Sequence, residues 1–366
     1  MKVLAHLCRI IVGVVFIFSG LIKLNDPVGT QIKLEEYFEV FAQDFPHMAS
    51  FWESLVPFAL FFSVLLCSLE VLAGVALLIQ WKLRKTTWFL VLLCTFFAFL
   101  TFYSAYFNKV TDCGCFGDMI KLKPWTSFWK DIILLVLLLV VLWQRKVFRP
   151  TRTGSIMVLA TIFCVALGIY AIRYLPPYDG LPYAVGQNIP ANMKNTEPFQ
   201  FRYIMTKNGK EETFTKYPSD TTYQFKEMIG PLNPEAGPKI TDYRLWNSEG
   251  DFTQASFQGN YLFLIIQDLK NVNRNSITEL RDLLKSLEGT AVQPAIVTSA
   301  NEDSFNQFRH EYQLSAPYYL ADYKVLKTIM RSNPGLWLLS NGTVKGKWSD
   351  ANVPTKEKVL ALATKN

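Results

Sequence analysis

The sequence predicts an all-α membrane bundle of four helices plus a fifth span, followed by a C-terminal α/β domain. Half of the 366 residues are apolar and only 18% are charged, whereas an average soluble domain has about 25% charged residues. The long apolar runs lie almost entirely before residue 176, and the remainder alternates short strands with helices, as α/β domains do. This composition excludes a wholly soluble protein and a disordered chain.

Five apolar runs have the length of a membrane span, which needs about 17–25 residues. They cover residues 3–22, 57–81, 88–107, 125–143 and 155–174. Buried core helices are the alternative, but five such runs leave too little polar surface to face water. The first run begins with the basic residues Lys2 and Arg9, like a signal peptide, yet it lacks an A-x-A cleavage site and continues into Lys23. We expect it to be an uncleaved span.

The charges between the runs predict the orientation, because basic links favour the cytoplasm. The links after the second and fourth runs carry basic residues and no acid: Lys82, Arg84, Lys85, Arg145, Lys146, Arg149 and Arg152. The link after the first run is acidic. We therefore expect a bacterial inner-membrane protein with a cytoplasmic N-terminus and a periplasmic C-terminal domain. Much of the net charge of +7 flanks apolar runs, so it indicates lipid contact and no nucleic-acid partner.

The loop after the third run carries Cys113 and Cys115, the only cysteines expected on the outer face. The other four lie inside predicted spans, and six cysteines are too few for a disulfide scaffold. A bridge between Cys113 and Cys115 is just possible, since Gly114 lets the chain bend. Such a ring is strained and easily reduced, which suits a catalyst that passes its disulfide on. Three interpretations stay open: a redox pair, a static clip, and half of a metal site completed by another protein.

Ionisable residues inside the runs form a second group of candidates, because charge at membrane depth is costly and usually faces a partner or a cavity. Arg9 and Glu70 lie deep in the first two runs. When residues are counted from the ends of the runs, their depths in the membrane differ by less than about two helical turns. We expect an ion pair that locks two helices, with a proton-relay or ligand role as the alternative. Lys23 and Asp131 lie near the outer ends, where they are expected to snorkel or to line a groove below the loop, to which Asp26 is also assigned.

Several stretches of the N-terminal half have a recognisable pattern. Residues 9–13 read RIIVG, residues 16–27 read FIFSGLIKLNDP, Glu70 lies in SLEVLAG, and residues 112–117 read DCGCFG. Over roughly residues 5–145 the sequence resembles the DoxX and MauE membrane proteins, with Glu70 and the loop pointing to the MauE branch. This resemblance implies a four-helix bundle similar in layout to vitamin K epoxide reductase, and a link to disulfide formation or redox maturation of secreted proteins. The chain lacks the C-x-x-C pair that faces quinone in that reductase, so no motif supports a quinone cofactor.

The C-terminal region begins with a hairpin at Asn208-Gly209, a pair that favours a type I′ turn. Alternating strands and helices follow, and over about residues 240–364 their order resembles the thioredoxin-like superfamily. Asn333-Pro334-Gly335 is similar to the cis-proline loop of that superfamily. However, residues 267–276, where its active-site cysteine belongs, contain none, and no cysteine follows Cys164. Thiol chemistry is thus excluded in this domain, which leaves recognition near Pro334 or a purely structural role.

We expect a membrane domain over residues 1–150, a fifth span and linker over 151–180, a β-rich extension over 181–238, and a cysteine-free thioredoxin-like domain over 239–366. Two functions remain. In the first, the CGC loop exchanges disulfides with exported proteins, as a thiol–disulfide oxidoreductase does, and the C-terminal domain recognises the client or an extracytoplasmic partner. In the second, the protein is a non-catalytic scaffold or accessory subunit of an envelope complex. The sequence has no phosphate loop, nucleophile triad or metal-ligand spacing.

Overall fold

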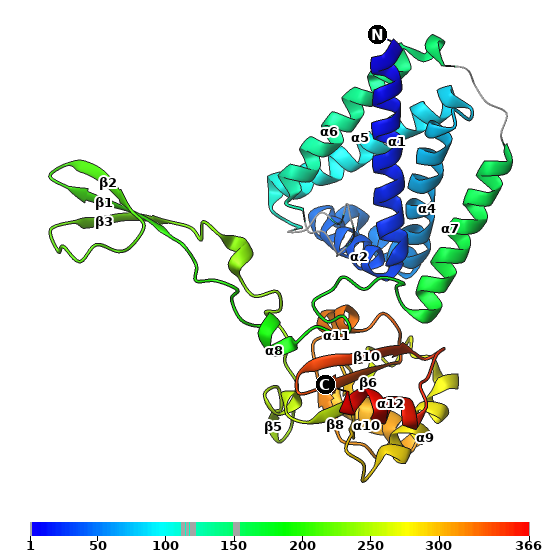
Figure 1. Ribbon diagram of the computed structural model, residues 1–366, viewed down its shortest axis with the longest axis vertical. Coiled ribbons are helices and arrows are strands. Elements are labelled where there is room, and N and C mark those ends of the chain that lie inside the picture. Colours follow the sequence, from blue (N-terminus) through cyan, green and yellow to red (C-terminus); the bar gives the residue numbers. More distant parts are fainter. Residues whose placement is uncertain (1, 111–113, 115–116, 118–121, 149–153, 366) are drawn as a thin grey trace. The chain divides into compact units, whose positions relative to one another are not determined.

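The computed structural model describes residues 2–110, 114, 117, 122–148 and 154–365 (Figure 1). The chain divides into two compact units, Met1–Leu181 and Pro182–Asn366. The first unit is helical, and the second contains all the strands of the two sheets. This division into an apolar helical part and a sheet-rich α/β part confirms the predicted fold class.

Five helices of the described residues are long and apolar enough to cross a membrane. They are α1 (Lys2–Asn25), α4 (Ala59–Leu78), α5 (Leu83–Phe107), α6 (Pro124–Trp143) and α7 (Gly154–Tyr174). The span that contains α4 begins earlier, at Pro46. Large apolar side chains project from them, such as Leu92, which is 70% exposed. Backbone hydrogen bonds inside each helix and apolar side chains outside are what a lipid environment requires. The five predicted spans are therefore confirmed, and the protein is a membrane protein.

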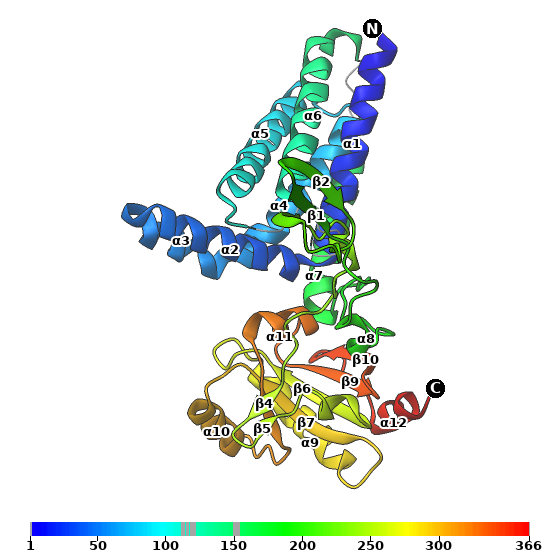
Figure 2. The same cartoon turned by 90° about the vertical axis from the view of Figure 1, so that its left-hand side faces the viewer.

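Helices α2 (Pro27–Asp44) and α3 (Ala49–Leu55) run across the others at one end of the bundle (Figure 2). Asp26 caps α2, because its Oδ1 accepts a hydrogen bond from the Gly29 backbone N–H at 3.0 Å. Tyr37 and Phe41 bury one face of α2 against Tyr103 of α5. The helix is thereby fixed by its cap at one end and by aromatic packing along its length.

Glycines allow α1 and α4 to pack closely in antiparallel directions. A Cβ atom on Gly74 would lie 2.8 Å from the Gly13 carbonyl oxygen, and one on Gly20 would lie 2.9 Å from the Cys67 carbonyl oxygen. Small residues at such contacts let helix backbones approach in a membrane. The contacts also fix the register of the two helices, since Gly13 faces Gly74 and Gly20 faces the turn that contains Cys67.

The second unit contains a seven-stranded sheet in the order β10-β9-β6-β7-β8-β4-β5. Its strands are β4 (Trp246–Asn247), β5 (Gly250–Asp251), β6 (Asn260–Ile266), β7 (Gln293–Thr298), β8 (Tyr318–Leu320), β9 (Gly335–Ser340) and β10 (Thr343–Ser349). Strands β6, β7 and β8 are parallel, β9 is antiparallel to β6, and β10 is antiparallel to β9. The α-helices that follow β6 along the chain are α9 (Ile277–Leu287), α10 (Glu302–Glu311), α11 (Tyr323–Ile329) and α12 (Lys356–Thr364). This topology is consistent with a thioredoxin-like domain.

The core of this unit lies between the sheet and its helices. Leu262 and Leu264 of β6 are fully buried, as the continuous apolar run of a central strand requires. They pack with Phe305 of α10, Leu284 of α9 and other side chains of one apolar cluster. The Asn333-Pro334 peptide bond is cis.

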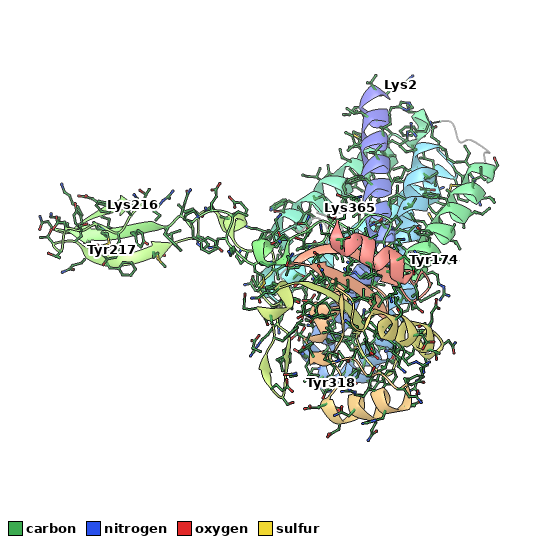
Figure 3. All side chains as sticks on the ribbon, turned by 60° about the horizontal axis from the view of Figure 1, so that its bottom comes forward. Lys2, Tyr174, Lys216, Tyr217, Tyr318 and Lys365 are labelled. Atoms are coloured by element: carbon green, nitrogen blue, oxygen red, sulfur yellow. The ribbon has the colours of Figure 1, made fainter. Side chains whose placement is uncertain are left out.

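A separate three-stranded sheet precedes this core, in the order β2-β1-β3. Its strands are β1 (Arg202–Lys207), β2 (Lys210–Phe214) and β3 (Gln224–Ile229), and a short helix, α8 (Ile189–Asn192), comes before them. Asn208 and Gly209 both have positive φ angles, 52° and 73°, as a type I′ turn demands. Figure 3 marks Lys216 and Tyr217 where the chain leaves β2.

Candidate functional site

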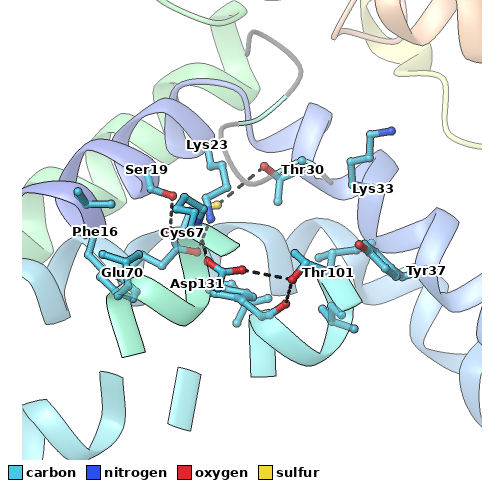
Figure 4. Close-up of a pocket in the computed structure, with 18 residues that line it drawn as sticks. Phe16, Ser19, Lys23, Thr30, Lys33, Tyr37, Cys67, Glu70, Thr101 and Asp131 are labelled. Carbon is cyan, nitrogen blue, oxygen red and sulfur yellow. Dashed lines mark hydrogen bonds and ion pairs between the residues drawn. The ribbon is translucent and has the colours of Figure 1, made fainter. Parts of the chain in front are cut away.

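A cavity of ≈ 80 Å³ lies among the helices of the membrane unit (Figure 4). Helices α1, α2, α4, α5 and α6 all contribute to its wall, together with Gly114. The polar and charged side chains that line it are Ser19, Lys23, Thr30, Lys33, Tyr37, Cys67, Glu70, Thr101, Lys130 and Asp131. One water molecule needs about 10–15 Å³ of such space, so the cavity has room for several water molecules.

Lys23 and Glu70 form an ion pair in the cavity wall. Lys23 Nζ contacts Glu70 Oε1, and Ser19 Oγ donates a hydrogen bond of 3.1 Å to Glu70 Oε2. Glu70 is only 1% exposed and Lys23 only 7%. A charge at this depth is costly by itself, so each group needs the other. Lys23 Nζ also lies 5.2 Å from the ring centroid of Phe97, a cation–π contact on a further wall of the cavity.

Asp131 of α6 brings a second carboxylate to the cavity. Lys130 Nζ lies 2.6 Å from Asp131 Oδ1, and Thr101 Oγ1 of α5 lies 3.4 Å from Asp131 Oδ2. Asp131 is 1% exposed. In Figure 4, Lys23, Glu70 and Asp131 converge from three different helices. Lys23 and Asp131 both line this cavity, and both side chains are buried.

Gly114, the central residue of the CGC motif, lies in the wall of this cavity. Its φ angle is +66°, and a Cβ atom there would lie 3.0 Å from Lys33 Cγ. The Gly114 carbonyl accepts a hydrogen bond of 3.0 Å from the backbone N–H of Gly117. A glycine suits this position both because of its positive φ and because of the close side chain. Cys113 and Cys115 themselves lie outside the described residues.

Arg9 lies at the opposite end of α1 from this cavity and does not pair with Glu70. Its Nη1 donates hydrogen bonds to the carbonyl oxygens of Leu77, at 3.0 Å, and Leu78. These carbonyls belong to the last turn of α4, where the helix dipole favours a cation. The ion pair expected between Arg9 and Glu70 is therefore wrong. The antiparallel register explains this, because it sets Arg9 level with Leu78, about 12 Å along α4 from Glu70 at about 1.5 Å per residue.

Two other predicted site residues have separate places. Asp26 caps α2 and is not among the residues that line the cavity, so its side chain serves the helix. Pro334 belongs to the second unit.

Sequence reasoning missed Cys67, Thr101 and Lys130 as members of the cavity wall. The i, i+3 spacing of Cys67 and Glu70 on one helix was a signal that could have found Cys67.

The loop of residues 267–276 is fastened to the cis-proline segment by hydrogen bonds. Asn333 Nδ2 donates to the Asp268 carbonyl at 2.9 Å, and Asn333 Oδ1 accepts from the Gln267 backbone N–H at 3.0 Å. The Asn273 backbone N–H donates to the Asn333 carbonyl at 2.9 Å. Amide and backbone contacts thus hold the loop in which the resemblance would require a cysteine.

The membrane unit also matches a known family. The family model of methylamine utilisation protein MauE matches residues 1–144. The match covers α1 to α6 and ends before α7, so the helices that enclose the cavity all lie within it. No curated protein matches the chain. Among the described residues, no group of three or more His, Cys, Asp or Glu side chains is placed to hold a metal ion.

Proposed function

We propose that the protein is an accessory membrane component of a redox system, in which the CGC loop exchanges disulfides with thiols of exported proteins. The observation that carries this proposal is the position of Gly114, the residue between the two cysteines, in the wall of a charged cavity. The MauE match over the same helices supports a redox setting. The basic links support a cytoplasmic N-terminus, which puts the loop and the C-terminal domain on the periplasmic side of a bacterial inner membrane.

The exchange passes through a mixed disulfide. The thiolate of one loop cysteine attacks a disulfide of the client and displaces one client sulfur as a thiolate. The second loop cysteine then attacks the mixed disulfide, which releases the client with two thiols and closes the Cys113–Cys115 bridge; the same two steps in reverse pass the bridge to a client dithiol. The C-terminal unit has no cysteine, so its part is recognition of the client or of a partner at the segment around Pro334. The proposed arrangement thus divides chemistry and recognition between the two units.

Single replacements of the two cysteines test this proposal. Cys113→Ala and Cys115→Ala should each leave one thiol, and the variant that lacks the resolving cysteine should accumulate a covalent client complex. Non-reducing gels of cell membranes, followed by treatment with dithiothreitol, detect the complex and its release. Cys164→Ala is the matched control, because Cys164 is a buried free thiol in an apolar cluster.

The alternative function, a scaffold with a static clip, gives a different result. Cys113 and Cys115 would then be fully oxidised in cells, neither single variant would trap a complex, and the double variant would keep the function of the wild type. Labelling with a membrane-impermeant maleimide before and after reduction measures the oxidised fraction. A mixture of oxidised and reduced protein supports exchange.

A further inference from the structure

We propose that the cavity is a water-filled proton-exchange site, in which Glu70 and Asp131 give and take the proton that the thiol exchange moves. This inference rests on the proposed function, and it adds a role for the buried charges that the disulfide chemistry alone does not require. Lys23 and Lys130 act as positioning residues, since each contacts one of the two carboxylates.

The buried charges of the cavity cost free energy, because they are removed from water. A buried ion pair contributes little net stability, because loss of hydration offsets most of the attraction between the partners. Two such pairs line one small cavity here, and Ser19 and Thr101 add hydroxyl groups to the two carboxylates. An apolar void would stay dry, but a polar cavity of this size fills with water. Water next to paired acids and bases is the medium in which a proton moves.

Several charged and titratable side chains of the described residues face the two carboxylates. Cationic and other titratable groups face Glu70 and Asp131 from four helices: Lys23 of α1, Lys33 and Tyr37 of α2, Cys67 of α4 and Lys130 of α6. Lys33 Nζ lies 3.1 Å from Oε2 of Glu36, a residue that does not line the cavity. Each carboxylate therefore has its own lysine, which holds it in place beside the space of the cavity.

The thiol exchange moves one proton for each sulfur that is displaced. A client thiol loses its proton when its sulfur attacks one loop sulfur. The bond between client and loop forms as the bond within the loop breaks, and the departing loop sulfur takes up one proton. Electrons are conserved between the two sulfur pairs, so this step needs no external oxidant. A positioned acid that protonates the departing sulfur through water typically accelerates such a step by about 10²–10⁴-fold.

The water content of the cavity can be measured with the native cysteines. In the Cys113→Ser/Cys115→Ser variant, only the four membrane thiols react, and Cys67 lines the cavity while Cys94 donates to the Asp131 backbone carbonyl at 3.2 Å. Because only the thiolate reacts, the reaction is run at alkaline pH, where methyl methanethiosulfonate should modify Cys67 faster than Cys94, Cys8 or Cys164, with mass spectrometry as the readout. Equal slow rates at all four positions would show a dry cavity and overturn the proposal.

The proton role is tested by the exchange rate of the loop with a dithiol peptide, measured between pH 5 and 9. Glu70→Ala and Asp131→Ala should slow the exchange about tenfold or more and change its pH profile. Formate, which is small enough for the cavity, should restore part of the rate in these variants and none in the wild type. Asp44→Asn is the matched control, because it removes a carboxylate that pairs with Lys109 outside the cavity.

The two proposals fail in different ways. If the wild-type loop exchanges with the peptide at no pH, the proposed function is wrong and the proton role falls with it. If the wild type exchanges and the carboxylate variants keep its rate and profile, the proton role alone is wrong. Where a single variant does not fold, Lys23→Gln/Glu70→Gln removes both charges of one pair and keeps the rate measurement possible. Slow exchange rescued by formate in the folded variants supports the inference.

Discussion

Lys23 of α1 and Glu70 of α4 form an ion pair inside the membrane bundle, next to the cavity that Gly114 reaches. The pair joins the two helices that glycines bring into close contact, so its geometry depends on their register. It also places one cation and one anion where neither can reach bulk water. The stability of the bundle therefore depends on this contact, and under the proposed function the chemistry at the loop depends on it too.

We expect Glu70→Gln to destabilise the protein, because it leaves the Lys23 ammonium buried without its counter-charge. Removing one partner of a buried pair costs about 3–5 kcal/mol in soluble proteins, and a thermal-unfolding measurement in detergent should show a lower Tm. Lys23→Met/Glu70→Gln should recover part of the loss. Arg9→Leu/Glu70→Gln should recover none, since Arg9 bonds to Leu77 and Leu78. Recovery by the Arg9 change would contradict the pairing described above.

A side chain at Gly74 should separate α1 from α4. In Gly74→Val, the Cβ position lies 2.8 Å from the Gly13 carbonyl, a backbone atom that cannot turn away. Overpacking of this kind costs about 1–3 kcal/mol or more, so yield and Tm should both fall. Gly154→Ala is the control, because no atom of the described residues lies within 4 Å of the Cβ position there. Equal stability of the two variants would argue against the close helix contact.

Asp44, at the end of α2, should make stability depend on acid pH. The hydrogen bond from the Tyr103 hydroxyl, followed by the hydrogen bond from Lys109, holds the pKa of Asp44 below its ordinary value. A carboxyl whose pKa is lower in the folded state stabilises that state above the unfolded pKa of about 3.9, and the effect disappears as the pH falls through the folded value. The Tm difference between wild type and Asp44→Asn should thus be constant near neutral pH and vanish in strong acid. Glu53→Gln, which replaces an exposed acid of α3, is the control for a change from carboxylate to amide.

The spans could be predicted from the sequence because each run is long, apolar and bounded by charge. The partner of Glu70 could not, because residue counting gives depth but not the register between two helices. That register is set by the packing of Gly13, Gly20 and Gly74, and the contact of their backbones is a tertiary property. The same limit hid Thr101 as a member of the cavity wall, because it lies on α5, and no periodicity specifies how α5 is rotated relative to the other helices. By contrast, Asn208-Gly209 acts locally, so its turn was predictable.

The orientation of the chain leads to a final prediction. The basic links after the second and fourth spans should stay in the cytoplasm, so the C-terminal unit should be exported. A green fluorescent protein fused after the last residue should stay dark, because this reporter does not fold when exported in the unfolded state, whereas alkaline phosphatase at the same place should be active. As a control, both reporters fused within residues 82–85, in the expected cytoplasmic link, should give the reverse pattern. A bright C-terminal fusion would put the loop in the reducing cytoplasm, where a strained disulfide is not maintained, and would remove the basis for exchange with exported proteins.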